Sequence, residues 1–454
     1  MVTFQAIRTF QAVLSTGGLP MQYSKYNHLC ELKGDSHAYL LYNFLTGALV
    51  KLDEEHKRLY EGILETEGHD DVRAFLLKNG FLIDNFDELN YLLLGNKLTC
   101  TDSELLSVLI APTLSCNFRC PYCFERHGSG MMDEKTQDAI IRFIEKSIQE
   151  HHHKQLFVYW FGGEPLLGID IIDHMAQQLL SLAHKYGVSY TSAMSTNGYF
   201  LTPENMAILE RAQVGRIQIT LDGMKETNDA TRVLANGEGS FDVIISNLRR
   251  MKTPIQIQIR SNLHKKNAEE FTQLKQLIDS IAAENGVNMS AYGAHMAKYE
   301  FNNENVDDMV LSMQEFSGVL KKNGIMGNSK ANRARFAFCD AAKVYSYCFD
   351  EKGNMYKCWN DIGTPSRAYD NVFSAMETGL DLSSVNATAF LARSFPDDPE
   401  CLACKVLPLC MGGCILKRVW EKQKTCSPVK YDMDDYVNKK YSLSVGADVA
   451  DTGN

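Results

Sequence analysis

The distribution of cysteine constrains this chain more than any other feature of its sequence. Eleven of its 13 cysteines fall into two groups, and only Cys30 and Cys100, which we expect to be ordinary buried thiols, stand apart. The N-terminus has no basic segment followed by a clean apolar core, so we expect no secretory signal and no disulfide scaffold. Close spacing then indicates metal or cluster ligation. The two groups are Cys116, Cys120 and Cys123, and Cys339, Cys348, Cys358, Cys401, Cys404, Cys410, Cys414 and Cys426.

The composition narrows the class of protein further. The chain has 454 residues, of which 45% are hydrophobic and 22% are charged, as in ordinary globular proteins, and its length suggests roughly three domains. Its net charge of −10 argues against a nucleic-acid partner. No apolar run reaches the roughly 18 residues of a membrane span, which argues against a membrane partner. We therefore expect a cytoplasmic location.

Residues 1–100 predict a small separate domain. Three short apolar stretches separated by turn sequences are followed by two helical stretches, and the first of these opens with acidic residues, as helix N-termini prefer. This β-β-β-α-α order predicts a winged-helix-like domain. The expected elements are Tyr26–Leu32, His37–Asn43, Gly47–Leu52, Asp53–Leu64 and Asp70–Asn79.

Residues 101–327 predict an α/β domain. Six apolar strands alternate with amphipathic helices, which indicates parallel strands with outer helices, a partial (β/α)6 barrel whose active face lies at the carboxyl ends of its strands. The expected strands are Leu106–Thr113, Phe157–Phe161, Tyr190–Ser195, Arg216–Leu221, Ile255–Asn262 and Asn288–Tyr292. The expected helices are Glu134–Ile148, Ile171–His184, Pro203–Gln213, Phe241–Met251, Ala268–Ala283 and Val306–Lys322.

Residues 328–454 predict a third domain that is rich in cysteine and turns and only weakly periodic, as expected where clusters replace an apolar core. A run of histidines, His151–His153, lies earlier in the chain, between a predicted helix and a predicted strand. Because no carboxylate-rich sequence surrounds this run, we expect it to be a solvated loop and not a metal site.

The first cysteine group has the spacing C-x3-C-x2-C and directly follows the first predicted barrel strand. A short loop with three thiolates can hold three corners of a [4Fe–4S] cluster, whose usual ligand set is four cysteines, and leaves one iron open to a small molecule. The alternatives are a zinc knuckle or a partial site completed by a distant residue, although a structural zinc site normally has four protein ligands.

With an aromatic residue before its last cysteine, this group resembles the radical S-adenosylmethionine (SAM) superfamily, over about residues 106–325. Other matching motifs follow at successive strand ends in the family's order, although each alone fits an ordinary turn or helix cap. The resemblance implies that a glycine-rich stretch approaches the methionine amino group, and that Ser/Thr and Arg side chains contact the ribose or carboxylate. The implied SAM contacts are Tyr122, Gly162, Gly163, Glu164, Pro165, Ser195, Asn197, Thr220, Arg232 and Arg260.

The second cysteine group resembles the twitch and SPASM auxiliary-cluster domains of peptide-modifying radical enzymes. The resemblance implies two further [4Fe–4S] clusters, three in all. This agrees with the cysteine count, since three clusters with one open iron need eleven ligands. The implied ligand sets are Cys339, Cys348, Cys358 and Cys414 for one cluster, and Cys401, Cys404, Cys410 and Cys426 for the other. A rival interpretation is a structural zinc site formed by Cys401, Cys404, Cys410 and Cys414.

A predicted hairpin offers a local check on the first auxiliary set. Residues 344–349 and 354–359 alternate around a turn centred near Gly353, which predicts that Cys348 and Cys358 lie roughly opposite each other. Cys348 is the least secure ligand, because the core motif does not require it.

The resemblance implies reductive cleavage of SAM to a 5′-deoxyadenosyl radical that abstracts hydrogen from an unactivated C–H bond. Residues 1–100 resemble the module with which maturases of ribosomally made peptides capture a leader segment as an added strand; the alternative is a cap that covers the barrel. We expect the substrate to be a precursor peptide and the product to be a cysteine thioether; a carbon–carbon crosslink is the second expected product. We expect the electron donor to be a flavodoxin or a ferredoxin.

Two other functions stay open. Anaerobic sulfatase-maturing enzymes, which form formylglycine, have similar motifs, but that family places an aspartate directly after the residue that matches Cys358. Here Trp359 occupies this position, which leaves Asp361 and Asp340 as candidate bases. From a different class, the chain could be a non-catalytic iron–sulfur or zinc scaffold.

Overall fold

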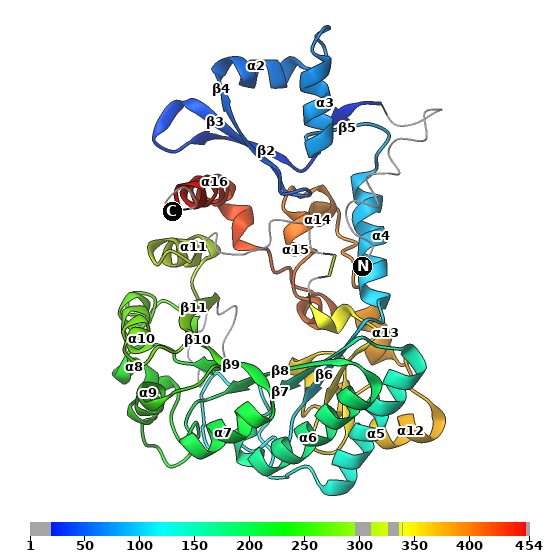
Figure 1. Ribbon diagram of the computed structural model, residues 1–454, viewed down its shortest axis with the longest axis vertical. Helices are drawn as coiled ribbons and strands as arrows, with labels where there is room; N and C mark the ends of the chain where they lie inside the picture. The colour runs from blue at the N-terminus through cyan, green and yellow to red at the C-terminus, as the bar shows by residue number, and fades with distance from the viewer. Residues whose placement is uncertain (1–19, 296–309, 326–335, 338, 451–454) are drawn as a thin grey trace. The chain divides into compact units, whose positions relative to one another are not determined.

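The computed structural model describes residues 20–295, 310–325, 336–337 and 339–450 (Figure 1). Its contacts divide the chain into two compact units. The first combines Met1–Cys100, Gly324–Phe338 and Ser394–Asn454, and the second combines Thr101–Asn323 and Cys339–Arg393. Residues 328–454, grouped above into one domain, are thus shared between both units, and the division into three consecutive domains stays a prediction.

The second unit is built on a nine-stranded sheet in the order β11-β10-β9-β8-β7-β6-β12-β13-β14. Strands β6 to β11 are parallel neighbours in chain order, which confirms the predicted α/β class with a central parallel sheet. Their buried residues, such as Val108, Val158 and Ile217, form the main core together with the helices. The six strands are β6 (Leu105–Ile110), β7 (Gln155–Trp160), β8 (Ser189–Thr196), β9 (Val214–Thr220), β10 (Gln256–Leu263) and β11 (Met289–His295).

The helices that begin at Glu134, Pro203 and Phe241 begin where the sequence predicts, and the first two begin at side-chain caps. The helix at Ile169 begins two residues earlier than predicted, the helix at Phe271 begins three residues later, and the short helix Lys225–Thr231 was not predicted. Asp133 accepts a hydrogen bond from the backbone N–H of Thr136, and Thr202 caps its helix in the same way. The predicted helix Val306–Lys322 begins only at Met313, and its residues 306–309 lie outside the described residues. The helices are α5 (Glu134–His151), α6 (Ile169–Tyr186), α7 (Pro203–Arg211), α8 (Lys225–Thr231), α9 (Phe241–Arg250), α10 (Phe271–Asn285) and α11 (Met313–Lys322).

The end of α5 corrects the expectation of a solvated histidine loop. His153 is buried: its Nδ1 donates to the carbonyl of Ser103 at 2.5 Å, and its Nε2 accepts from the hydroxyl of Ser147 at 2.9 Å. The imidazole therefore links the end of α5 to the segment that enters β6, a long-range role that the local sequence does not reveal.

Three further strands extend the sheet beyond β6. Strand β12 (Ser346–Phe349) pairs parallel with β6 and antiparallel with β13 (Asn354–Tyr356), and β13 pairs with β14 (Asp370–Asn371). The predicted hairpin is present, but its register pairs Cys348 with Tyr356 and not with Cys358.

The shift arises from the turn. Asp350 accepts hydrogen bonds from the backbone N–H groups of Lys352 and Asn354, both at 2.9 Å, which centres the turn one residue earlier than predicted. Two helices complete this unit, α12 (Val372–Thr378) and α13 (Val385–Leu391).

The first unit contains an antiparallel sheet of β2 (Asn27–Leu32), β3 (Asp35–Asn43) and β4 (Leu49–Asp53). A two-stranded sheet joins β1 to β5. Helices α2 and α3 follow β4 as expected. Helix α4 was not predicted, because its buried Asn96 interrupts the apolar stripe of the helix. The Asn96 amide donates a hydrogen bond to the carbonyl of Phe336 at 2.6 Å. The remaining bounds are β1 (Gln22–Tyr23), α2 (Glu54–Gly62), α3 (Asp70–Asn79), β5 (Leu82–Ile83) and α4 (Glu88–Thr101).

One apolar core unites the two ends of the chain within this unit. Buried residues of β2 and β3 pack in the same cluster as residues from the C-terminal segment, among them Leu40, Leu407 and Tyr436. Polar contacts add to this, since the Asn438 amide donates to the carbonyl of Glu31 at 3.0 Å. The C-terminal helices are α14 (Pro399–Ala403), α15 (Leu407–Cys410) and α16 (Met433–Ala450).

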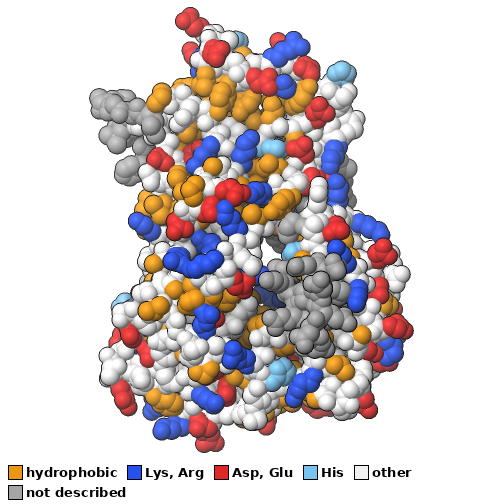
Figure 2. All heavy atoms as spheres, turned by 180° about the vertical axis from the view of Figure 1, so that it is seen from behind, with side chains coloured by type: hydrophobic (Ala, Val, Ile, Leu, Met, Phe, Trp, Pro, Cys, Tyr) orange, Lys and Arg blue, Asp and Glu red, His pale blue; other side chains and the backbone are white. Residues whose placement is uncertain are grey.

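On the face drawn in Figure 2, basic and acidic side chains are interspersed. Among the helices that the structure describes, none has the length and apolar composition needed to cross a membrane.

Candidate functional site: three cysteine clusters and a cofactor cradle

The loop that carries the first cysteine group is fixed on both sides. It follows β6, and its residue Phe118 forms an isolated β-bridge with Leu234. Neighbouring backbone groups extend this pairing, since the N–H of Arg119 donates to the carbonyl of Val233 at 2.8 Å. The segment after α8 therefore holds the cysteine loop through backbone hydrogen bonds.

The three thiols of this loop lie close enough to influence one another. Burial, with smaller contributions from Glu164, Cys120 and Cys123 nearby, raises the pKa of Cys116 to about 12. Burial likewise raises the pKa of Cys123 to about 11. Because the thiolate is the metal ligand, these converging thiols fit a cation that displaces their protons, as the iron of a cluster does.

Gly162 and Gly163 lie against the backbone that leads into this loop. Gly162 has a φ of +118°, and a Cβ atom there would lie 2.3 Å from the carbonyl oxygen of Thr113. A Cβ atom at Gly163 would lie 2.4 Å from the carbonyl oxygen of Ser115. Chain packing therefore already requires both glycines.

Glu164 ties the carboxyl ends of two strands together. It is fully buried and accepts hydrogen bonds from the hydroxyl of Thr196 at 2.7 Å, from the N–H of Asn197 at 2.7 Å and from the N–H of Leu166 at 3.0 Å. Burial raises the pKa of Glu164, whereas these hydrogen bonds lower it. Pro165 follows at the start of a 3₁₀ helix, where a proline is favoured.

Asn197 continues this connection to the cysteine loop. Its amide Nδ2 donates to Asn117 Oδ1 at 2.7 Å, and Asn117 directly follows Cys116. Glu164, Asn197 and Asn117 thus form a polar chain from the ends of β7 and β8 to the cysteine loop.

A second buried network joins Tyr122 and Arg232. The Tyr122 hydroxyl donates to Asp222 and accepts from Arg232 Nη1 at 2.9 Å, and Arg232 also lies over the ring of Phe118. The carboxylate of Asp222 is held in turn by the N–H of Asn262 at 2.9 Å. Sequence reasoning did not select Asp222, although its place just after β9 was a signal that could have found it.

The remaining predicted contacts lie along the sheet. Ser195 Oγ is 2.7 Å from the Tyr159 hydroxyl and accepts from Gln218 at 3.1 Å. Thr220 and Arg260 are direct partners in the parallel register of β9 and β10.

Both predicted arginines have donor capacity left for an anion. Among the described residues, the buried Nε atoms of Arg232 and Arg260 have no hydrogen-bond partner. Unpaired buried donors are costly, so a carboxylate such as that of SAM fits them.

The first auxiliary group gathers Cys339, Cys348 and Cys358 in the second unit. Burial raises the pKa of Cys358, and the neighbouring Cys348 and Cys339 contribute to the rise. Tyr356 pairs with Cys348 at the end of β13, and Cys358 follows two residues later, beyond the strand. Cys414 belongs to the first unit, and its ligation of this cluster stays a prediction.

The residues around this group differ in what they can do. Asp340 is ion-paired with Lys343 at 2.7 Å, which commits one of its carboxylate oxygens, whereas Asp361 is buried and its charge raises the pKa of Cys358. Trp359 is 47% exposed and stacks on Phe161.

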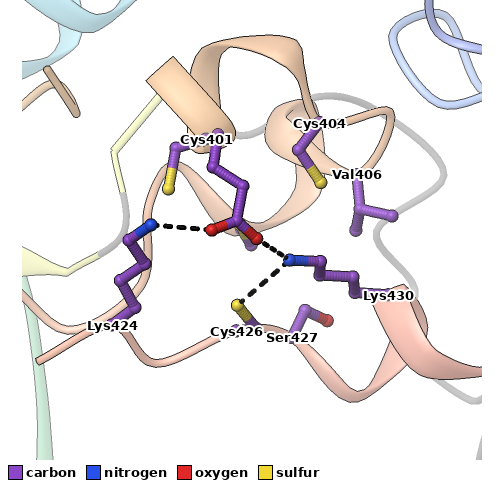
Figure 3. Close-up of a pocket in the computed structure, with 9 residues that line it drawn as sticks. Cys401, Cys404, Val406, Lys424, Cys426, Ser427 and Lys430 are labelled. Atoms are coloured by element: carbon purple, nitrogen blue, oxygen red, sulfur yellow. Dashed lines mark hydrogen bonds and ion pairs between the residues drawn. The ribbon is translucent and has the colours of Figure 1, made fainter. Parts of the chain in front are cut away.

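The second auxiliary group lines a single pocket in the first unit. Figure 3 shows the pocket, where Lys424, Glu400 and Lys430 accompany the thiols. Hydrogen bonds from both lysines lower the pKa of Glu400 to about 2. The pocket's cysteines are Cys401, Cys404, Cys410 and Cys426. This is the set that the resemblance implies. The rival zinc set, with Cys414 in place of Cys426, does not match the pocket lining.

One further group of donors lies outside these sites. The ligand atoms of His28, Cys30 and Asp434 lie within 4.8 Å of one another, and His28 Nε2 is 2.6 Å from Asp434 Oδ1. The group offers three donors where a closed zinc site has four, so we assign no metal to it.

Comparisons with known proteins agree with this arrangement. Residues 110–278 match the model of the Radical SAM superfamily, so this part of the chain is a radical SAM domain. It is 26% identical over 347 residues to a cysteine-type anaerobic sulfatase-maturating enzyme of Clostridium novyi (strain NT), covering 68% of this chain and 87% of that protein. It is 22% identical over 429 residues to the radical SAM cyclopropyl synthase TigE of Paramaledivibacter caminithermalis, covering 87% of this chain and 85% of that protein.

A solved structure shares the fold. Native anSMEcpe with bound AdoMet and Cp18Cys peptide superposes with a TM-score of 0.59 at 17% identity, covering 77% of this chain and 100% of that chain.

Proposed function

We propose that the chain binds SAM and three [4Fe–4S] clusters and oxidatively modifies a peptide. The observation that carries the proposal is the pocket in which Cys401, Cys404, Cys410 and Cys426 converge. Cleavage of SAM needs only the three-cysteine site, so a separate four-thiolate pocket supports a reaction that passes a further electron through the protein.

The residues of the second unit would prepare this reaction. When bound, SAM and the open cluster supply a 5′-deoxyadenosyl radical that removes hydrogen from a C–H bond. Arg232 and Arg260 would hold the SAM carboxylate, whereas the fully buried Glu164, which already accepts three hydrogen bonds, would fix the backbone of the glycine-rich stretch beside the cofactor. Burial of this network keeps water away from the reacting groups.

The substrate we favour is a ribosomally made precursor peptide whose cysteine forms a thioether. Among the described residues, β4 pairs only with β3, whereas Asn438 contacts the backbone of β2 at the opposite edge. The open edge of β4 can therefore accept a leader segment as an added strand. TigE, whose similarity extends over 87% of this chain, supports a substrate-modifying radical reaction.

Sulfatase maturation is the second candidate. The similarity to the Clostridium novyi enzyme supports it directly. Trp359 separates the two candidates, because sulfatase-maturing enzymes are expected to carry an aspartate at this position. A cysteine-to-formylglycine reaction would therefore have to use another base, either Asp361, which is buried, or Asp340, which is paired with Lys343.

Intact mass distinguishes these reactions. The chain, with its clusters reconstituted anaerobically, is incubated with the short peptide encoded beside its gene, and separately with a cysteine-containing sulfatase peptide. A loss of two hydrogens per site, with cysteines that resist alkylation, supports the thioether. The same loss with free cysteines supports a carbon–carbon crosslink. Formylglycine on the sulfatase peptide alone supports maturation. A reconstituted chain that yields no 5′-deoxyadenosine would contradict the enzymatic proposal altogether.

A further inference from the structure

The pocket of the second auxiliary group contains charged side chains in a fixed order. Lys430 Nζ donates to Cys426 Sγ at 3.8 Å and to Glu400 Oε1 at 2.6 Å (Figure 3). On the other side of Glu400, Lys424 Nζ donates to Oε2 at 2.7 Å and lies 2.8 Å from Asp398 Oδ2. Lys430 is thus a cation in contact with a ligand sulfur, and Glu400 is an anion that partly neutralises it.

Short elements that also carry the cysteines position these charges. Glu400 directly precedes Cys401 in α14, whose N-terminus Asp398 caps. Lys430 lies in the 3₁₀ helix Pro428–Tyr431, which Ser427 caps, and Ser427 directly follows Cys426. An exposed ion pair usually contributes little to the stability of the fold. Here the same short backbone segments carry the cysteines and the charged side chains, so the charges are held close to the thiols.

The charge of a cluster changes when it takes up an electron. A [4Fe–4S] cluster with four thiolate ligands goes from a net charge of −2 to −3 in a one-electron reduction. A cation and an N–H···S hydrogen bond stabilise the more negative state more strongly, so they raise the reduction potential, and a nearby anion lowers it.

We propose that Lys430 raises the reduction potential of the cluster held by Cys401, Cys404, Cys410 and Cys426, and that Glu400 limits this rise. The proposal rests on the proposed function, since it requires a cluster in this pocket. Lys430 and Glu400 are positioning residues for electron uptake from the substrate, and they act on the potential with opposite signs.

Potentiometric titration of the full-length, reconstituted chain, followed by electron paramagnetic resonance, tests the proposal. The signal that is lost in the double variant Cys404→Ser/Cys410→Ser identifies the cluster. In Lys430→Gln we expect the ratio of reduced to oxidised cluster at a fixed potential to fall about tenfold, which is about 59 mV for one electron. In Glu400→Gln we expect the ratio to rise. Lys430→Arg keeps the charge and should stay near the parent.

Lys422→Gln is the matched control, because it removes the same charge from an exposed side chain shortly before Cys426, where solvent screens it. Iron and sulfide analysis accompanies every variant. If Lys430→Gln loses the cluster, Glu400→Gln still tests the sign.

Shifts of the same sign in Lys430→Gln and Glu400→Gln, or no shift beyond that of the control, would overturn the inference while leaving the cluster in place. A parent chain in which the double serine variant removes no signal would instead overturn the proposed cluster itself.

Discussion

Phe161 and Trp359 stack with ring centroids 6.0 Å apart and planes inclined by 16°. Phe161 follows β7 and directly precedes Gly162 of the predicted SAM cradle, whereas Trp359 directly follows Cys358 of the first auxiliary group. The stack therefore joins the predicted radical-forming site to the predicted auxiliary site, and its exposed indole is available to a substrate side chain.

Replacement of Trp359 tests this role. We expect Trp359→Ala to lower kcat/KM for the peptide about 3- to 10-fold, since an aromatic contact contributes about 0.5–1.5 kcal/mol beyond its buried area. Steady-state kinetics with iron analysis measures the effect. Val385→Ala, which shortens an exposed apolar side chain in the same unit, is the control. Equal kinetics for both variants would remove Trp359 from substrate binding.

Gly163→Ala should disrupt the approach of β7 to the cysteine loop. The new Cβ would lie 2.4 Å from a backbone oxygen of Ser115, which cannot move without displacing Cys116, so we expect a cost of about 1–3 kcal/mol and reduced iron in the first site. Thermal unfolding and iron analysis check this. Gly318→Ala, where the added Cβ meets open space, should leave both unchanged or slightly improve stability.

Cluster loading should depend on pH with a definite sign. The raised pKa values of Cys116, about 12, and Cys123, about 11, mean that each thiol is protonated at neutral pH and loses its proton on binding iron. Below those values, the apparent affinity should rise up to about tenfold per thiol for each pH unit.

Competition with an iron chelator at pH 7 and pH 8, corrected for the chelator's own protonation, measures the pH effect. Affinity that is independent of pH would mean that the thiols are already ionised. In the metal-free protein, the raised pKa values favour folding below about pH 9, and this contribution is lost as the pH rises through the folded values.

The shared core predicts that a change in β3 affects the C-terminal cysteine pocket. Leu40 and Leu41 are both fully buried, but Leu40 packs in the cluster that includes Val406 and Leu407, whereas Leu41 packs in a separate cluster with α2 and α3. We expect Leu40→Ala and Leu41→Ala each to cost about 2–5 kcal/mol.

Only Leu40→Ala should also lower the iron content of the second auxiliary site, because only Leu40 shares a core with the segment that bears its cysteines. Chemical denaturation and iron analysis of both variants decide the point. Equal iron loss in both would show that general instability, and not this core, governs the pocket.

The sequence allowed much of the second unit to be predicted, because parallel strands and amphipathic helices have strong periodicity. The six strands fall within a few residues of their expected bounds, and the hairpin at Gly353 is present. The predicted register of this hairpin was wrong by one position at the turn. Hydrogen bonds to the Asp350 side chain set the turn, and the periodicity of the sequence does not encode them.

The site was predictable in its ligands and motifs but not in its connections. Cysteine spacing and strand-end motifs selected Cys116, Glu164 and Arg232, because chemistry restricts those residue types. The buried carboxylate of Asp222 and the charges of Lys430 were missed, since their roles depend on contacts between residues far apart in the chain.

The common core of the chain's two ends also bears on biosynthesis. The ribosome makes β2 and β3 first, but Leu407 and Tyr436, their partners in that core, emerge last. Until then, the early strands lack part of their apolar cover, whereas the loop of Cys116 and the segment at Leu234 that bridges to it have already been made. If the proposed clusters bind as the chain folds, the site at Cys116 should therefore become complete before the pocket of Cys401, Cys404, Cys410 and Cys426.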